Sequence, residues 1–513
     1  MALKKINPNS DRYYVDSLDL ELPNNFPLFL KSITLDPFRH IENLVANFQH
    51  PISIISGTNR SGKSTILMAL ACSHFEFNKR NAQNGRLERH TWSSLMQFTN
   101  HDEQLRDWTY YISYKRGAKT ETKRGQRKAV TSKWNGIGKK ESQFRGRQVI
   151  FLDLERVLPA RNFGKTIYHR ARRATTSVIS PSNVIRIEKY LSFILEENFN
   201  LHKLANYADK DIFRYNNSNQ YSSYNAATGE EVLSKIIIDI VEAQNNSLIL
   251  IDEIEVGLHP KVQRRLMDVI YHISRTDKKQ FIISSHSPSI LSSVPDKSRI
   301  FIQKSPRGEY KSLSNISVNA CLSKMDSFAY PLFDLYCEDS EAKKIIQKAI
   351  TSIQSEKQIS NFGDLVNIIV SGSGDKTFNY YSVHKETYPL KKIKTGFACI
   401  LDGDRRMLTT SSGVAQYPPE ECLHFIYSNF SPEKFLLEEY LLQFPNTTLS
   451  YHLSNSNVHS LFDKMIECSI CTTKEEAFEL CWSTFLNTTY GHDYFEELKN
   501  FILGMVDKYS PEL

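Results

Sequence analysis

The sequence predicts an α/β protein in which two parallel-sheet domains follow one another and helices close the chain. Three observations lead to this prediction. An apolar stretch at 52–56 runs into a glycine loop and a helix, a second apolar stretch at 247–251 ends in paired acids, and three further apolar stretches after residue 330 alternate with helical spacing. Strands and helices that alternate in this way form parallel sheets, whose ligands bind at the carboxyl ends of the strands.

The first glycine loop has the spacing of a phosphate-binding loop, because residues 57–65 read Gly-Thr-Asn-Arg-Ser-Gly-Lys-Ser-Thr. The two glycines allow the backbone to curl so that N–H groups and the next helix's N-terminus face phosphates. We expect Lys63 to reach the β- and γ-phosphates and Ser64 to bind Mg²⁺. The nucleotide-binding residues predicted from this loop are Gly57, Asn59, Gly62, Lys63, Ser64 and Thr65.

A second motif supplies the acids that such a site needs. The apolar residues 248–251 are followed directly by Asp252 and Glu253. Phosphoryl transfer depends mostly on positioning and charge neutralisation, so we expect Asp252 to hold the Mg²⁺ and Glu253 to orient the attacking water. The glycine loop and the acidic motif occur in this order in one chain, and this disfavours the simpler alternative of a glycine turn beside an unrelated acidic strand end.

With these residues in place, residues 1–315 resemble the ABC-type ATPase domains of the OLD (overcoming lysogenization defect) family. The run Asp-Glu-Ile-Glu-Val-Gly-Leu-His-Pro, which starts at Asp252, is the most specific part of the resemblance. The resemblance implies that His286 senses the γ-phosphate and that Gly229 belongs to a signature loop closing on the nucleotide of a second protomer. It therefore implies ATP and Mg²⁺ as cofactors, and a homodimer or higher homo-oligomer formed through the ATPase heads. Ala227 departs from the serine usual in that loop.

In the second half of the chain, acidic residues follow the predicted strands. One apolar strand leads to Glu338, and another leads to Asp402 and Asp404. Oxygen ligands from two adjacent strands can share Mg²⁺ ions and leave positions open for a phosphate. The sequence therefore predicts a divalent-metal site at one edge of the second sheet.

This pattern resembles the TOPRIM fold of topoisomerases, primases and OLD-family nucleases. The resemblance implies that Glu338, Asp402 and Asp404 are catalytic and hold Mg²⁺, with Mn²⁺ as an alternative ion. It adds Glu341 as a further metal ligand, the second acid of a Glu-x-x-Glu pair.

Three positions depart from this pattern or stay open. A glycine usually follows the first glutamate, and here Asp339 follows it. The family also offers a metal-binding acid from a helix expected after residue 431, for which Glu438 is our candidate and Glu439 its neighbour. The family's late lysine is not assigned by the sequence. An alternative therefore stays open, in which the protein is an ATPase sensor or scaffold whose TOPRIM domain binds nucleic acid without cutting it and works with a separate effector.

Positive charge is concentrated in one segment of the first domain. Residues 115–147 contain twelve Lys or Arg against two Glu, a local charge of +10, whereas the whole chain carries +7. Such a cluster can neutralise several phosphates and give salt-dependent nucleic-acid binding. The alternative is a solvated β-hairpin or insertion without a ligand. We predict a basic insertion at this position and DNA as the substrate.

Composition limits where such a protein can work. The chain has 513 residues, 40% of them hydrophobic and 11% aromatic, as expected for a folded protein of two or three domains. There is no run of 18 apolar residues and no apolar signal core at the N-terminus, so we expect a cytoplasmic protein that does not contact a membrane.

Cys468 and Cys471 form a lone Cys-x-x-Cys, for which core packing is the favoured interpretation.

These features together predict an ATP-regulated, Mg²⁺-dependent DNA endonuclease. Its ATPase domain is expected at 1–315, and its TOPRIM nuclease domain, ending in helices, at 330–513. The resemblance implies a role in bacterial defence against phage, either alone or, as in retrons, with a reverse transcriptase and its RNA–DNA product as partners. A repair ATPase with a long coiled coil is disfavoured, since no heptad repeat interrupts the head.

Overall fold

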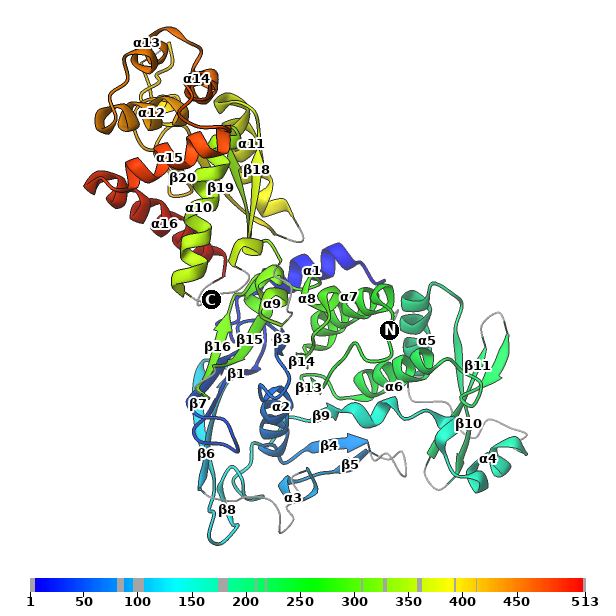
Figure 1. Cartoon of the computed structure of the whole chain (residues 1–513). Coiled ribbons are helices and arrows are strands. Elements are labelled where there is room, and N and C mark those ends of the chain that lie inside the picture. The colour runs from blue at the N-terminus through cyan, green and yellow to red at the C-terminus, as the bar shows by residue number, and fades with distance from the viewer. Residues whose placement is uncertain are drawn as a thin grey trace. The chain divides into compact units, whose positions relative to one another are not determined.

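The computed structural model describes residues 5–80, 87–95, 106–173, 183–207, 210–216, 219–305, 308–325, 330–357, 362–391, 394–411 and 413–510. The chain divides into two compact units, Met1–Ile316 and Ser317–Leu513, which are described separately. Figure 1 labels their helices and strands. Among the described helices, none has the length and apolar character that crossing a membrane requires.

The first unit is built on an eight-stranded sheet with the order β16-β15-β3-β14-β13-β9-β4-β5. Its strands are β3 (Ile52–Gly57), β4 (Phe77–Arg80), β5 (Leu87–Arg89), β9 (Val149–Leu152), β13 (Leu248–Ile251), β14 (Gln280–Ser284), β15 (Arg299–Lys304) and β16 (Tyr310–Ser314). Pairing is parallel from β15 through β4 and antiparallel at the two edges. Every residue of β3, β9, β13 and β14 is buried, as expected for parallel strands covered on both faces.

Helices connect and cover these strands. The helices of the first unit are α1 (Pro8–Asp16), α2 (Lys63–Cys72), α3 (Trp92–Leu95), α4 (Lys165–Arg172), α5 (Val184–Leu195), α6 (Thr228–Glu242), α7 (Pro260–Asp277) and α8 (Pro288–Leu291). Helix α2 follows β3 after the loop 58–62 and packs against β3, β9, β13 and β14. Figure 1 shows α2 beside the strands of this sheet, with β3, β13 and β14 among those that it contacts.

Part of the basic segment 115–147 belongs to a second sheet of this unit. That sheet is antiparallel with the order β2-β1-β6-β7-β8, and its strands are β1 (Leu28–Leu35), β2 (Leu44–Asn47), β6 (Trp108–Arg116), β7 (Lys119–Arg127) and β8 (Trp134–Gly136). Aromatic rings pack beneath it: Trp92 and Trp134 stack with centroids 4.1 Å apart, and Phe38 lies 5.3 Å from Trp108. A third sheet joins β10 (Asn200–Tyr207), β11 (Lys210–Asn216) and β12 (Gln220–Ser222).

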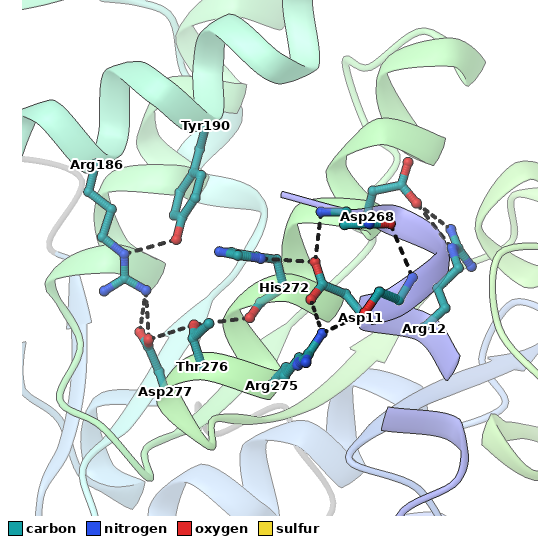
Figure 2. Close-up of polar contacts among 11 residues, drawn as sticks. Asp11, Arg12, Arg186, Tyr190, Asp268, His272, Arg275, Thr276 and Asp277 are labelled. Atoms are coloured by element: carbon teal, nitrogen blue, oxygen red, sulfur yellow. Dashed lines mark hydrogen bonds and ion pairs between the residues drawn. The ribbon is translucent and has the colours of Figure 1, made fainter. Parts of the chain in front are cut away.

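Buried charges fasten the N-terminal helix to α7 (Figure 2). The carboxylate of Asp11 accepts hydrogen bonds from His272 Nδ1 (2.9 Å) and Arg275 Nη1 (3.0 Å). Arg12 pairs with Asp268 at 2.8 Å. Because Asp11 and His272 are both almost fully buried, replacing His272 would leave the Asp11 carboxylate buried without one of its partners.

The second unit is a four-stranded, wholly parallel sheet with helices before and between its strands and five more helices after the last strand. The strand order is β18-β17-β19-β20, with β17 (Phe333–Cys337), β18 (Val366–Val370), β19 (Gly396–Leu401) and β20 (Leu423–Phe425). The helices are α9 (Val318–Met325), α10 (Ser340–Lys357), α11 (Gly374–Thr387), α12 (Pro432–Gln443), α13 (Thr447–Asn455), α14 (Leu461–Glu467), α15 (Lys474–Leu486) and α16 (Thr489–Tyr509). The predicted α/β architecture, with a second parallel sheet and C-terminal helices, is confirmed; the TOPRIM assignment stays a prediction.

Candidate functional site

The glycine loop after β3 closes around its own lysine. Gly57 and Gly62 have φ of +150° and +99°. A Cβ on Gly57 would lie 2.3 Å from the carbonyl oxygen of Ile302, so no larger residue fits there. Lys63 Nζ donates to the carbonyl of Gly57 over 3.1 Å. Burial lowers the pKa of Lys63, although the charges of nearby acids oppose this effect.

Two serines on neighbouring elements hold Asp252 at the end of β13. Ser64, in the first turn of α2, donates to Asp252 Oδ2 over 2.7 Å, and Ser284, at the end of β14, donates to Oδ1 over 2.5 Å. Asp252 is 6% exposed. The structure thus brings the predicted Mg²⁺ ligands Ser64 and Asp252 together beside the loop lysine, as a nucleotide-bound Mg²⁺ requires.

Glu253 lies next to a histidine and has an unusual backbone. Its Oε1 is 3.3 Å from His286 Nε2, and its N–H donates to Ser284 Oγ over 2.8 Å. Burial raises the pKa of Glu253, but the hydrogen bond and charge of His286 and the charge of Lys63 outweigh it, and the net pKa is lowered. An ionised carboxylate in this position can accept a proton from water.

The left-handed backbone of Glu253 (φ +48°) is stabilised by a residue that sequence reasoning missed. Arg156, in the short 3₁₀ segment Leu154–Val157, donates through Nη1 to the carbonyl of Asp252 (2.8 Å) and through Nη2 to that of Glu253 (2.5 Å). Strained residues of this kind cost about 1–3 kcal/mol and cluster at functional sites. No sequence motif marks Arg156, because only the fold brings its side chain near the backbone carbonyls of Asp252 and Glu253.

The remaining predicted nucleotide-site residues lie around this centre in three different settings. Thr65 is buried in α2 and its hydroxyl accepts from Arg39 Nη1 at 3.4 Å. Asn59 is exposed in the glycine loop. Gly229 opens α6, where a Cβ would approach the carbonyl of Gly257 to 2.7 Å. Gly229 therefore contacts the loop that follows Glu253 in its own chain.

In the second unit, three predicted acids come together at the carboxyl ends of two adjacent parallel strands. Glu338 follows β17, and Asp402 and Asp404 follow β19. Each offers an oxygen, and the three oxygens lie within 4.8 Å of one another. The backbone N–H of Asp402 donates to Glu338 Oε1 over 2.9 Å. Oδ1 of Asp402 is buried and accepts no hydrogen bond from any described residue. This donor set fits a divalent cation with oxygen ligands.

The charges around Glu338, Asp402 and Asp404 also indicate a divalent cation as the ligand. Burial, followed by the charges of Glu338, Asp339 and Asp404, raises the pKa of Asp402 to about 9. Arg405 partly balances the group, because its Nε lies 3.4 Å from Glu338 and 3.5 Å from Asp404. A bound cation would offset the remaining repulsion between the carboxylates.

Two further predicted metal ligands, Glu341 and Glu438, belong to no cluster of metal-binding side chains among the described residues. Glu341, in the first turn of α10, instead pairs with Lys344 over 2.9 Å. Helix α12 contributes Glu433, not Glu438, to a second group that also contains Asp339 and His459. Five residues along an α-helix turn the side chain by about 140°, so the two glutamates face different directions.

Asp339 replaces the expected glycine without adopting a left-handed backbone. Its Oδ1 accepts from the backbone N–H groups of Glu341 (2.9 Å) and Ala342 (2.8 Å), which caps α10. An Asp directly before a helical stretch is a recognisable N-cap signal, so this role was readable from the sequence.

The fold buries part of the positive charge of residues 115–147. Lys115, Arg127 and Arg147 are buried, and Arg147 donates to the carbonyl of Asn246 over 2.9 Å. The exposed basic residues of the segment are Arg116, Lys119, Arg124, Lys128, Lys133, Lys139, Lys140 and Arg145. Within the segment, the end of β6 and all of β7 and β8 belong to the antiparallel sheet, and its exposed residues are the ones available to a ligand. That the segment is an insertion stays a prediction.

Comparison with protein families identifies the first unit. Residues 122–292 match the family described as "AAA domain, putative AbiEii toxin, Type IV TA system". The match covers less than half of the chain, includes the Asp252 strand, and ends before the second unit. With the glycine loop, it shows a P-loop ATPase domain, which implies ATP as the ligand. No curated protein sequence matches the chain.

Solved structures with some similarity to this chain are SMC heads. The SMC head domain from Thermotoga maritima is 11% identical, with a TM-score of 0.35, and the similarity covers 56% of this chain and 98% of that one. The SmcHead bound to the C-winged helix domain of ScpA is 15% identical, with a TM-score of 0.38 and coverages of 56% and 98%. A Smc head with an extended coiled coil, derived from Pyrococcus furiosus, is 12% identical, with a TM-score of 0.36 and coverages of 56% and 96%.

Proposed function

We propose that this protein is an ATP-regulated, metal-dependent DNA endonuclease of the OLD type. The observation that carries the proposal is the convergence of Glu338, Asp402 and Asp404 at the ends of two parallel strands, in a chain whose first unit is an ATPase domain. Acids at the carboxyl ends of adjacent strands are what a TOPRIM nuclease requires, and the sequence of the second unit resembles that family.

In the proposed nuclease site, Glu338, Asp402 and Asp404 hold Mg²⁺, or Mn²⁺ in its place. The ion supplies Lewis-acid polarisation of the scissile phosphate. Arg405 contributes a fixed positive charge beside Glu338 and Asp404. This charge favours a phosphate over a neutral ligand.

In the proposed ATPase site, Lys63 contacts the β- and γ-phosphates while Ser64 and Asp252 hold Mg²⁺. Glu253 orients the attacking water, and His286 keeps that carboxylate ionised and in place over 3.3 Å. Gly229 and the start of α6 are proposed to close on the nucleotide of a second protomer, which makes the active form a homodimer or higher oligomer.

ATP is proposed to regulate cutting through this assembly. Nucleotide that binds between two heads stabilises the dimer, and it thereby changes the fraction of protein in a cutting-competent state. The exposed basic residues of 115–147 are proposed to bind the DNA backbone without sequence preference. A defence role against phage, alone or with a reverse transcriptase and its RNA–DNA product, follows from the family resemblance.

One observation favours the alternative of an ATPase scaffold with a non-cutting second unit. Arg405 already neutralises part of the acidic group, and in a site that only binds nucleic acid such a pairing would suffice. Cleavage of supercoiled plasmid in Mg²⁺ or Mn²⁺ separates the two functions. The nuclease proposal expects cutting by the wild type and none by Asp402→Asn/Asp404→Asn; absence of cutting by the wild type in either metal, with DNA binding intact, favours the scaffold.

A further inference from the structure

We infer that Asp339, Glu433 and His459 form a second divalent-metal site with a nitrogen ligand, separate from the group at Glu338, Asp402 and Asp404. One ligand atom from each of the three residues lies within 4.8 Å of the other two. The three come from different segments: the cap of α10, the first turn of α12, and the 3₁₀ segment Val458–Ser460.

Glu433 gives the strongest indication of a missing partner. The residue is only 4% exposed, and its Oε2 is buried without a hydrogen bond from any residue that the structure describes. Its Oε1 is 3.0 Å from His459 Nδ1. A buried carboxylate oxygen without a donor is unfavourable, and a cation coordinated at that oxygen would satisfy it.

The other two residues are held in positions that leave a ligand atom free for an ion. Asp339 uses Oδ1 to cap α10, and Oδ2 takes part in no hydrogen bond with the described residues. His459 has its backbone N–H bound to Asn457 Oδ1 (3.0 Å), while its side chain is 72% exposed. The exposed imidazole gives an ion a route of entry from solvent and leaves coordination positions open to water.

Charge also favours a cation over a simple ion pair. Two carboxylates face one imidazole, so the group keeps a negative charge even when His459 is protonated. A divalent ion would neutralise both carboxylates at once.

The two groups share a turn of the chain. Glu338 belongs to the first and Asp339 to the second, and they are consecutive residues after β17. The carboxylates of the two groups are therefore held close to one another by the backbone, and a cation in either group lowers the negative charge that the other experiences. Binding of an ion in one group therefore changes the affinity of the other.

The ligand set defines the class of metal. An imidazole nitrogen with two carboxylate oxygens suits Zn²⁺, Co²⁺ or Mn²⁺, whereas Mg²⁺ prefers oxygen ligands alone. The site is therefore expected to prefer a transition metal, in contrast to the all-oxygen group beside it. This inference goes beyond the proposed nuclease, because metal binding here does not depend on whether DNA is cut.

Cobalt provides a direct test on the full-length, nucleotide-free protein after chelator treatment. Co²⁺ is titrated and its visible absorption is recorded for the wild type, His459→Ala, Glu433→Gln and Asp402→Asn/Asp404→Asn. His452→Ala is the matched control, since the His452 ring bonds to Ser456 within its own helix end and lies outside both groups.

The expected result is that His459→Ala loses the absorption band of nitrogen-bound Co²⁺ and weakens one binding event by at least about tenfold. The aspartate double variant keeps that band, and His452→Ala behaves as the wild type. Identical titrations of wild type and His459→Ala would overturn the site. Because His459 is exposed, its variant should fold even where Glu433→Gln fails to do so, and thermal unfolding of each variant verifies this.

Discussion

The hydroxyl of Ser64 donates a hydrogen bond to Oδ2 of Asp252 over 2.7 Å, across 188 positions of sequence. This bond joins the first turn of α2, directly after the glycine loop, to the acidic end of β13. The sequence marks the two motifs separately, and their contact is what a Mg²⁺ ion shared between loop and strand would need.

Glu253→Gln is predicted to abolish most ATP hydrolysis while ATP binding persists. The amide keeps the shape of the side chain but cannot accept a proton, so turnover should fall by about 100-fold or more. Phosphate release and binding of a fluorescent ATP analogue measure the two properties. Hydrolysis at the wild-type rate would show that Glu253 does not orient the water.

Arg156→Gln is predicted to slow hydrolysis without contacting nucleotide. The change removes hydrogen bonds to the carbonyls of Asp252 and Glu253, so the left-handed turn at Glu253 loses its support. We expect kcat to fall by at least about tenfold, in line with about 1–3 kcal/mol of released strain, with KM nearly unchanged. A rise in KM alone would argue that Arg156 acts on ATP binding instead.

His74 is predicted to make the first unit sensitive to acid. Its Nδ1 is 2.7 Å from the carbonyl of Leu70 and its Nε2 is 2.7 Å from the hydroxyl of Tyr114. Since the carbonyl can only accept, the neutral ring donates there and accepts from Tyr114. Burial lowers the pKa of His74 from 6.5 to about 3.

Between those two pKa values the unfolded chain binds a proton that the folded protein does not, so stability falls as pH decreases from about 6.5 to about 3. The slope from this group reaches about 1.4 kcal/mol per pH unit. Denaturant unfolding of wild type and His74→Gln across this range measures it. Parallel pH profiles for the two proteins would contradict the prediction.

Asp404→Asn and Glu438→Gln are predicted to differ in DNA cleavage. Among the described residues, Asp404 lies in the acidic group beside Glu338, whereas Glu438 belongs to no such group. Cleavage should therefore fall by more than about 100-fold in the first variant and stay near the wild-type rate in the second. Equal losses of cleavage in both variants would show that Glu438 acts in the nuclease site, as the sequence predicts.

The exposed basic residues are predicted to set the salt dependence of DNA binding. Replacing Lys119, Arg124, Lys133 and Lys139 by Gln removes four charges without touching the buried Lys115 or Arg147. The slope of log affinity against log salt should shrink by about 0.9 for each phosphate that the variant no longer neutralises. Fluorescence anisotropy at several salt concentrations gives the slope; an unchanged slope would place DNA on another surface.

Much of the architecture could be predicted from sequence because its strands are continuous apolar runs that end in motif residues. Gly57 to Thr65, and Asp252 with Glu253, are recognisable by their spacing. Arg156 could not be predicted, because it acts through backbone carbonyls that only the fold brings near. Glu433 was missed for a similar reason: within α12 the sequence offers several glutamates, and only the direction that each faces separates them.

Cleavage of one supercoiled plasmid by the wild type, Glu253→Gln and Asp402→Asn, each with and without ATP in Mg²⁺, tests the central claim most directly. The account predicts cutting that requires Asp402. It also predicts that the cutting changes with ATP in both the wild type and Glu253→Gln, because ATP binding, and not ATP hydrolysis, stabilises the dimer of ATPase heads. Cutting that survives in Asp402→Asn, or that is indifferent to ATP in every protein, would contradict it.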